Sequence, residues 1–187
     1  MRTRIGLWAG GIALLVALAV LWLHARTVRY DDILRQAATR HQIEFHLVKS
    51  IVFEESWFRA GARGAAGELG LMQVTRLAAA DYAEGNGLPP VTETRLFEPR
   101  LNVEIGSWYL RKSLDRYRDS PAPALFALLR YNAGEVHADR WLQEALAHPV
   151  PPGTSAEAHC LSFVDFPRTR EYARRILRRA GRRSYWI

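Results

Sequence analysis

The chain has 187 residues, 49% of them hydrophobic, which is enough for one domain with its own core and excludes a disordered chain. The 26 Lys and Arg residues outnumber the 19 Asp and Glu residues, giving a formal net charge of +7. That charge suits a nucleic acid, a membrane surface or the cell wall as partner, and also simple solubility. Cys160 is the single cysteine, so no disulfide forms within the chain, and we expect a small buried side chain there.

An uncharged apolar run occupies residues 5–23, with arginines on both sides of it. At about 1.5 Å per residue, a helix of this length just crosses a bilayer core of about 30 Å. The alternative is a cleaved signal peptide, but the run is long for a signal core and Leu-His-Ala at 23–25 is a poor cleavage site. We therefore predict a signal anchor over residues 1–27 in the inner membrane, followed by one domain over residues 28–187 in the periplasm.

Two helices are predicted after the apolar run. Residues 30–40 carry apolar side chains on one side and two aspartates in the first turn, where the helix dipole favours them. The second helix covers about residues 46–55 and ends at Glu54 and Glu55. Helical spacing weakly favours Glu55 as the functional carboxylate, because it lies one turn after Ile51 on the apolar face. The alternative is that both glutamates are solvated charges at a helix end.

A glycine-rich loop follows the glutamates, with glycines at positions 61, 64, 67 and 70. The run is too short for collagen and contains no proline, so the remaining alternative is a generic flexible loop. Glycines let the backbone approach another group closely, which would help a loop to face a buried carboxylate. After the loop, Leu71 and Met72 are expected to be core anchors, and Gln73 is expected to face the cleft.

Further helices are predicted over residues 75–84, 122–131 and 136–146, the second of them strongly apolar. Gly-Asn-Gly-Leu-Pro-Pro at 85–90 breaks the first of these, and a proline-rich stretch at 148–155 reads as a loop rather than a domain boundary.

Another helix is expected to start near Pro99, where proline suits the first turn. Gly106 lies inside that helix at a cost of about 1 kcal/mol relative to alanine, which indicates close packing. Asn102 is interpreted as structural. Arginines recur between residues 168 and 183, and we interpret them as a solvated helix face; the alternatives are contacts with stem-peptide carboxylates, phosphates or lipid head groups.

Four short motifs follow one another along the chain and are read together. Glu-Ser-Trp-Phe occupies 55–58, Gly-Leu-Met-Gln 70–73, Tyr-Asn-Ala-Gly 131–134 and Phe-Pro-Arg-Thr-Arg-Glu-Tyr 166–172. Together they resemble the soluble-type (SLT) family of lytic transglycosylases, within the lysozyme-like superfamily. The resemblance covers about residues 30–180. It implies a mainly α, lysozyme-like (goose-type/SLT) single helical domain after one N-terminal transmembrane helix.

The resemblance implies cleavage of the MurNAc–GlcNAc β-1,4 bond of peptidoglycan with a 1,6-anhydromuramoyl product. Glu55 would act first as acid and then as base, with Trp57 and Phe58 expected to supply an apolar setting that raises its pKa. The substrate-binding residues implied by the motifs are Gln73, Tyr131, Asn132, Met72 and Gly70. No cofactor and no metal are predicted, since the histidines and the single cysteine lack metal-ligand spacing.

Three positions depart from the family pattern. Gly64 stands where the family usually has a serine thought to bind the N-acetyl group, which puts that contact in question. Glu68 replaces a small residue and adds a carboxylate near the loop; we expect it to point into solvent. Arg168 replaces a glutamate in the last motif and reverses its charge.

Other functions remain open. A muramidase on the same fold would use water in place of the substrate hydroxyl, with Glu68 as a helper. A non-catalytic peptidoglycan-binding scaffold is favoured by Gly64 and Arg168 and opposed by the intact Glu55 and Tyr131. No nucleic-acid partner is predicted. The layout fits general wall remodelling and service to an envelope-spanning secretion or conjugation machine equally well, and endo and exo cleavage are not distinguished.

Overall fold

The computed structural model describes residues 2–182, and the side chains from residue 12 onward except that of residue 13. Its elements, in chain order, are α1 (Arg2–Val28), α2 (Asp31–Arg40), α3 (Phe45–Ser56), α4 (Arg76–Gly85), the 3₁₀ helix η1 (Glu93–Phe97), α5 (Pro99–Arg116), α6 (Pro123–Ala133), α7 (Glu135–Leu146), α8 (Ala156–Ser162) and α9 (Pro167–Gly181). Between residues 2 and 182 the only β pairing consists of two isolated bridges in the loop before α4. The prediction of a mainly α domain is confirmed.

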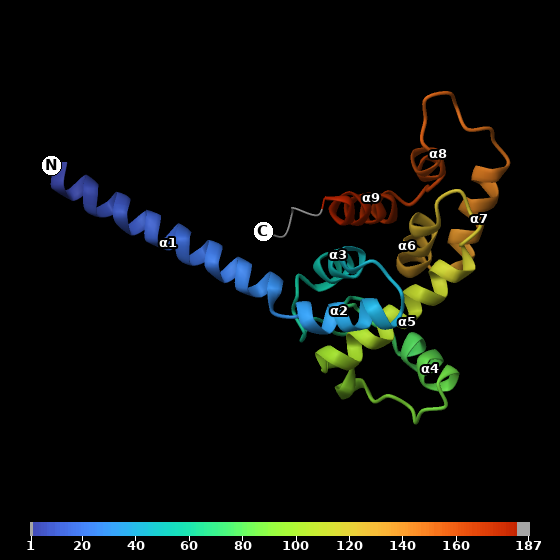
Figure 1. The fold of residues 1–187 in the computed structure, drawn as a ribbon, viewed down its shortest axis with the longest axis horizontal. Coiled ribbons are helices and arrows are strands. Elements are labelled where there is room, and N and C mark those ends of the chain that lie inside the picture. Colours follow the sequence, from blue (N-terminus) through green and yellow to red (C-terminus); the bar gives the residue numbers. More distant parts are fainter. Residues whose placement is uncertain (1, 183–187) are drawn as a thin grey trace.

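α1 forms a rod that extends away from the other helices (Figure 1). Its last turn contacts the domain, where Arg26 Nε donates a hydrogen bond of 2.8 Å to the carbonyl oxygen of Trp57. The predicted membrane anchor falls in part on residues whose side chains lie outside the described set. Among the residues that the structure does describe, none of the helices has the length and apolar character needed to span a bilayer.

The predicted helices are present, and their first residues have physical reasons. The Thr75 hydroxyl accepts a hydrogen bond from the Ala78 N–H at the start of α4, and Pro99 and Pro123 occupy the first turns of α5 and α6. The sequence pattern predicts no helix just after the loop at 148–155. α8 nevertheless forms there, with Ser155 as its N-cap.

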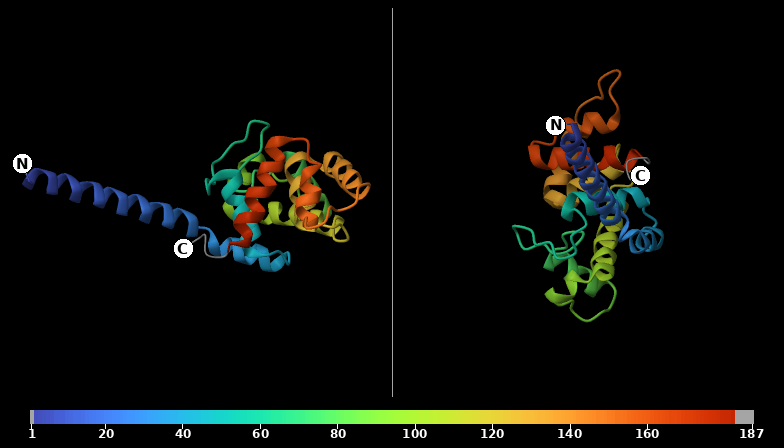
Figure 2. Two further views of the ribbon diagram at one scale, coloured as in Figure 1. Left: turned by 90° about the horizontal axis from the view of Figure 1, so that it is seen from above. Right: turned by 90° about the vertical axis from the view of Figure 1, so that its left-hand side faces the viewer.

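The core forms where α5 packs against α2, α4 and α6, while α9 packs against α3 and α6. The two views of Figure 2 agree that α9 runs beside α3, so the last helix of the domain lies next to the helix that ends at Glu55. Cys160 is fully buried and free, as expected. This arrangement brings side chains more than a hundred residues apart to the end of α3.

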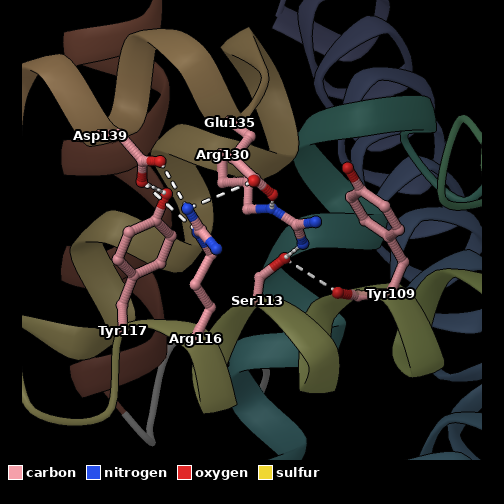
Figure 3. A network of polar contacts seen from close by, with 7 residues as sticks. All are labelled: Tyr109, Ser113, Arg116, Tyr117, Arg130, Glu135 and Asp139. Atoms are coloured by element: carbon pink, nitrogen blue, oxygen red, sulfur yellow. Dashed lines mark hydrogen bonds and ion pairs between the residues drawn. The ribbon is translucent and has the colours of Figure 1, made fainter.

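A polar network ties α5, α6 and α7 together (Figure 3). Arg130 on α6 is buried; it donates to Ser113 Oγ at 2.7 Å and to Glu135 Oε2 at 2.9 Å. Arg116 and the Tyr117 hydroxyl both donate to Asp139, at 2.6 Å each. Because every member has a partner, the network fixes α6 against α5. α6 carries the Tyr-Asn-Ala-Gly motif at its end.

Candidate active site

Two residues of α5, Asn102 and Gly106, pack against the loop before α4. Asn102 is fully buried: it accepts the Met72 N–H at 2.8 Å and donates to the carbonyl oxygens of Leu69 and Leu96 at 2.7 and 2.8 Å. The structural role predicted for Asn102 is confirmed. A Cβ at Gly106 would lie 2.6 Å from Met72 Sδ, so the close approach predicted there is also confirmed, although the neighbour is a loop side chain rather than a helix.

Glu55 lies in the last turn of α3. The helix ends at Trp57, which has the left-handed φ of 53°, and the chain turns directly into the glycine-rich loop. The buried Ser56 hydroxyl lies 3.0 Å from the Val52 carbonyl oxygen and 2.8 Å from that of Leu71, so it joins the end of α3 to the turn that carries Gln73. These contacts hold Glu55 and the loop in one fixed relation.

The surroundings of Glu55 favour its protonated form. The pKa of Glu55 is raised to about 7, mainly by burial and to a smaller extent by the charges of Glu54 and Glu68. The Tyr172 hydroxyl donates a hydrogen bond of 2.6 Å to Glu55 Oε1, which opposes the rise. Trp57 and Phe58 are the aromatic residues predicted to cover Glu55. Phe58 is buried, but Trp57 is half exposed. The aromatic side chain in direct contact with the Glu55 carboxylate is that of Tyr172 on α9.

Glu54, one residue earlier, faces two arginines of α9 instead. Arg175 donates to Glu54 Oε1 from Nε at 2.8 Å and also from Nη2, and Arg179 Nη1 lies 3.3 Å from Oε2. The Arg179 guanidinium also covers the Phe53 ring at 4.0 Å. The prediction that the arginines of α9 form only a solvated face is therefore wrong for these two, because they neutralise Glu54.

Two cavities share Asn132, and each is lined by a tyrosine close to Glu55: Tyr131 in one and Tyr172 in the other. One, of about 230 Å³, is lined by Gln73, Tyr131 and Asn132 together with parts of α4, α5 and α6. The other, of about 460 Å³, is lined by Asn132, Arg168 and Tyr172 with other residues of α9. Asn132 Oδ1 accepts a hydrogen bond of 2.8 Å from the Thr169 hydroxyl, which fixes its orientation between the cavities. Three of the predicted binding residues are thus brought together.

Met72 and Gly70 lie beneath the surface of this site. The Met72 side chain is fully buried, and its carbonyl oxygen accepts a 2.8 Å hydrogen bond from the Tyr131 hydroxyl. A Cβ at Gly70 would lie 2.3 Å from Asn102 Nδ2, and its φ of 79° suits glycine. Their contacts are those of residues that position Gln73 and Tyr131, and the substrate contact predicted for them stays a prediction.

The family model described as the transglycosylase SLT domain matches residues 32–149. The chain belongs to the SLT domain family. The match starts in α2 and ends just after α7, so it takes in Glu55, the glycine-rich loop and the Tyr-Asn-Ala-Gly motif.

The SLT domain has relatives of known name. Membrane-bound lytic murein transglycosylase F of Desulfosudis oleivorans is 32% identical over 118 residues, covering 62% of this chain and 24% of the relative. Membrane-bound lytic murein transglycosylase C of Histophilus somni is 35% identical over 115 residues, covering 58% of this chain and 32% of the relative. The chain therefore spans about a quarter to a third of the length of these relatives.

The fold of the SLT domain recurs in solved structures. An inactive mutant of the lytic transglycosylase Slt from Pseudomonas aeruginosa matches with a TM-score of 0.70 and 23% identity, over 82% of this chain and 23% of the other. The 70 kDa soluble lytic transglycosylase of Escherichia coli matches with a TM-score of 0.68 and 21% identity, over 81% of this chain and 23% of the other. The lysozyme-like helical architecture expected from the motifs is confirmed.

Two of the departures from the SLT pattern meet in space. A Cβ at Gly64 would lie 2.2 Å from Glu68 Oε2, so the Glu68 carboxylate occupies the place where a side chain at position 64 would start. The expectation that Glu68 points into solvent is wrong: the side chain is only partly exposed, and the Ala66 N–H donates to Oε2 at 3.0 Å. A glycine at position 64 and a glutamate at position 68 therefore fit one another.

Tyr172, Thr169 and Ser56 belong to the site, although the sequence analysis assigned them no role. Each lies inside a motif of the SLT family: Ser56 follows Glu55, and the other two are in the motif at 166–172. The motifs were the signal that could have identified them. Tyr172 contacts Glu55, Thr169 contacts Asn132, and Ser56 contacts the carbonyl oxygen of Leu71.

Proposed function

We propose that this chain is a membrane-anchored lytic transglycosylase that cleaves the MurNAc–GlcNAc β-1,4 bond of peptidoglycan and leaves a 1,6-anhydromuramoyl end. Membership of the SLT family and the names of the relatives support the activity. The observation that carries the proposal is Glu55: it accepts a hydrogen bond from Tyr172, which lines one of the cavities, and its pKa is raised to about 7. A glutamate with its ordinary pKa would be ionised at neutral pH and could not donate a proton.

In the first step, the protonated Glu55 carboxyl gives its proton to the glycosidic oxygen as the bond from that oxygen to C1 breaks, and positive charge develops on the sugar. In the second step, the ionised Glu55 accepts the proton of the C6 hydroxyl of the same sugar while that oxygen bonds to C1. The proton balance closes, so Glu55 is ready for another turnover. An attacking group within the substrate needs no bound water and is already close to C1.

Gln73, Tyr131 and Asn132 are proposed to orient the sugar beside Glu55, because they line one cavity. Met72 and Gly70 are proposed to contribute through their backbone, since the Met72 carbonyl oxygen fixes the Tyr131 hydroxyl. Burial, with the nearby Glu55 charge, raises the pKa of Tyr131 well above its ordinary value, so this hydroxyl stays protonated and keeps its hydrogen bond at neutral pH.

A hydrolysing muramidase is the second candidate, and the position of Glu68 favours it. A second carboxylate in the cleft is the group that glycosidases use to activate a water molecule. The overall site is the same in both cases, and the products distinguish them: an anhydro end for the transglycosylase and a reducing end for the muramidase.

The test uses the full chain in detergent micelles with purified peptidoglycan, beside Glu55→Gln, and identifies released fragments by mass spectrometry. We expect anhydro-ended fragments from the unaltered chain and a loss of at least about a thousandfold in rate for Glu55→Gln, since the acid step is lost. Glu54→Gln, altered at the adjacent carboxylate, is the matched control and should release fragments. Reducing-ended fragments would establish the muramidase, and retained activity in Glu55→Gln would refute the assignment of Glu55.

The membrane anchor is proposed for α1, with the SLT domain in the periplasm. The apolar sequence of residues 5–23 and the membrane-bound relatives support it. Extraction of membranes with alkaline carbonate should leave the chain in the pellet, and N-terminal sequencing should start near Met1. Release into the supernatant together with a start after residue 23 would instead identify a cleaved signal peptide. Service to an envelope-spanning machine would show as co-purification of the chain with that machine after crosslinking.

A further inference from the structure

The glycine-rich loop folds back on itself, which brings Glu68 over Gly64. The Gly64 N–H donates to the Glu68 carbonyl oxygen at 2.8 Å, and the Gly70 N–H donates to the Ala62 carbonyl oxygen at 2.9 Å. The Ala66 N–H then holds Glu68 Oε2 at 3.0 Å. The Glu68 carboxylate is therefore fixed by the backbone of its own loop rather than by a cation.

A second oxygen atom approaches the same place. The ideal Cβ position of Gly64 lies 2.2 Å from Glu68 Oε2 and 2.7 Å from Gln73 Oε1. The amide nitrogen of Gln73 is engaged on the other side, where it donates to the Gly70 carbonyl oxygen at 2.9 Å. Glu68 Oε2 and Gln73 Oε1 thus converge beside Gly64, which has no side chain. One hydrogen-bond donor placed between these two oxygen atoms could reach both.

Both oxygen atoms have unused acceptor capacity. A carboxylate offers about four lone-pair sites, and one hydrogen bond to the side-chain carboxylate of Glu68, from the Ala66 N–H, is seen among the described residues. In the same part of the chain, no donor reaches Gln73 Oε1. Acceptors that are partly removed from water are stabilised by a donor, so the chemistry of this place favours an N–H or O–H group of a ligand.

The place belongs to the cleft of Glu55. Gln73 lines the smaller cavity beside Tyr131, and the Glu68 charge contributes to the raised pKa of Glu55. The other titratable or charged groups around Glu55 are Glu54 on α3, Tyr131 on α6, and Tyr172 and Arg175 on α9. Among the neighbours whose charge raises the pKa of Glu55, Glu68 is the one contributed by the glycine-rich loop.

We propose that Glu68 and Gln73 form an acceptor pair that binds the acetamido N–H of the amino sugar being cleaved, and that the Glu68 charge stabilises the positive charge developing at the adjacent C1. This inference rests on the proposed function. The acetamido group is bonded to C2, next to the reacting carbon, so a carboxylate bound to its N–H is close enough to act on C1. Gly64 is required because any side chain there would displace Glu68.

The test compares Glu68→Gln, which keeps the shape and removes the charge, with Glu68→Ala and with Glu84→Gln as the control on the exposed side of α4. Using soluble peptidoglycan fragments and the full chain in detergent, we expect Glu68→Gln to lower kcat about tenfold with KM changed less than about threefold. The alkaline limit of activity should move to lower pH, because the charge that favours protonated Glu55 is gone. Glu84→Gln should match the unaltered chain.

A binding measurement keeps this test separate from the proposed reaction. Isothermal titration of a Glu55→Gln chain with an N-acetylglucosamine tetramer should show about tenfold weaker binding when Glu68→Ala is added, and no change when Glu84→Gln is added. Unchanged kcat, pH profile and tetramer affinity in both Glu68 variants would overturn the acceptor pair. If instead the unaltered chain releases no fragments while the Glu68 variants bind the tetramer weakly, the proposed reaction fails and the acceptor pair stands.

Discussion

Glu54 and Glu55 are adjacent carboxylates at the end of one helix, and they lie in opposite environments. Glu54 faces α9 and is paired with Arg175 and Arg179, so its charge is compensated. Glu55 lies beside Tyr172 and Tyr131, which line the two cavities, and it accepts a hydrogen bond from the neutral Tyr172 hydroxyl. The helical rotation of about 100° between consecutive residues is enough to separate the two environments.

A single helix end thus holds one carboxylate paired with arginines and one whose pKa is raised by burial. A paired carboxylate is stabilised in its charged form, while burial without a cation stabilises the neutral form. Because α9 supplies both the arginines that pair with Glu54 and the tyrosine that contacts Glu55, the packing of α9 on α3 sets the surroundings of both glutamates. The following predictions alter one side of this comparison at a time.

Among the changes that leave Glu55 in place, the largest effect is expected from pH. Since Glu55 must be protonated to act as an acid and its pKa is about 7, kcat/KM should fall about tenfold per pH unit above that value, so about a hundredfold by pH 9. Initial rates of fragment release between pH 5 and pH 9 measure this. An alkaline limb centred below pH 5 would mean that the carboxyl has its ordinary pKa.

Glu55→Gln should also change stability in a pH-dependent way. The folded-state pKa of about 7 is higher than the ordinary 4.5, so the folded state binds the proton more tightly, and the free energy of unfolding falls as pH rises from 4.5 through 7. Glutamine has no such dependence. Urea titrations should therefore show the variant gaining stability relative to the unaltered chain, by on the order of 3 kcal/mol above pH 7 and by little near pH 4. Parallel pH curves would contradict the raised pKa.

Tyr172→Phe removes the hydroxyl that lowers the pKa of Glu55 and fixes its orientation. We expect about tenfold lower kcat and an alkaline limb displaced to higher pH, because the ionised form loses its donor. Tyr131→Phe is the matched control: its hydroxyl donates to the Met72 carbonyl oxygen, so kcat should fall without a displaced limb. Equal pH profiles for the unaltered chain and Tyr172→Phe would show that the hydrogen bond has no electrostatic role.

Much of this arrangement was predictable from local sequence. Apolar spacing predicts α2, α3, α4, α6 and α7 to within about two residues, and Pro99 predicts the start of α5. The motif containing Ser56 predicts that Glu55 is the functional glutamate. α8 was not predicted, because its seven residues follow a proline-rich loop and carry no sustained period. Short helices of this kind depend on tertiary packing, here the burial of Cys160 and Leu161.

The sequence pattern could not predict contacts between segments that lie far apart in the chain. Tyr172 is 117 residues from Glu55 and Arg175 is 121 residues from Glu54, and the register of α9 along α3 determines both contacts. The sequence of an arginine-rich helix is equally compatible with a solvated face and with ion pairs to another helix. Gly64 and Glu68 meet only because the loop folds back on itself. The sequence shows each of them as a separate departure from the family motif and does not show that they are in contact.

The smallest effect is expected on the structural side of the comparison. Glu54→Gln leaves Arg175 and Arg179 without their carboxylate, and because Arg175 is 41% exposed, solvent screens part of the loss. We expect the free energy of unfolding to fall by about 1 kcal/mol and kcat at pH 6 to change less than about threefold, since Glu54 is held by the arginines of α9. The control is Glu144→Gln, whose i,i+4 ion pair with Arg140 on α7 is exposed on both sides and should contribute less than about 0.5 kcal/mol. A loss of activity in Glu54→Gln as large as in Glu55→Gln, at unchanged stability, would mean that the two carboxylates share the chemistry rather than divide it.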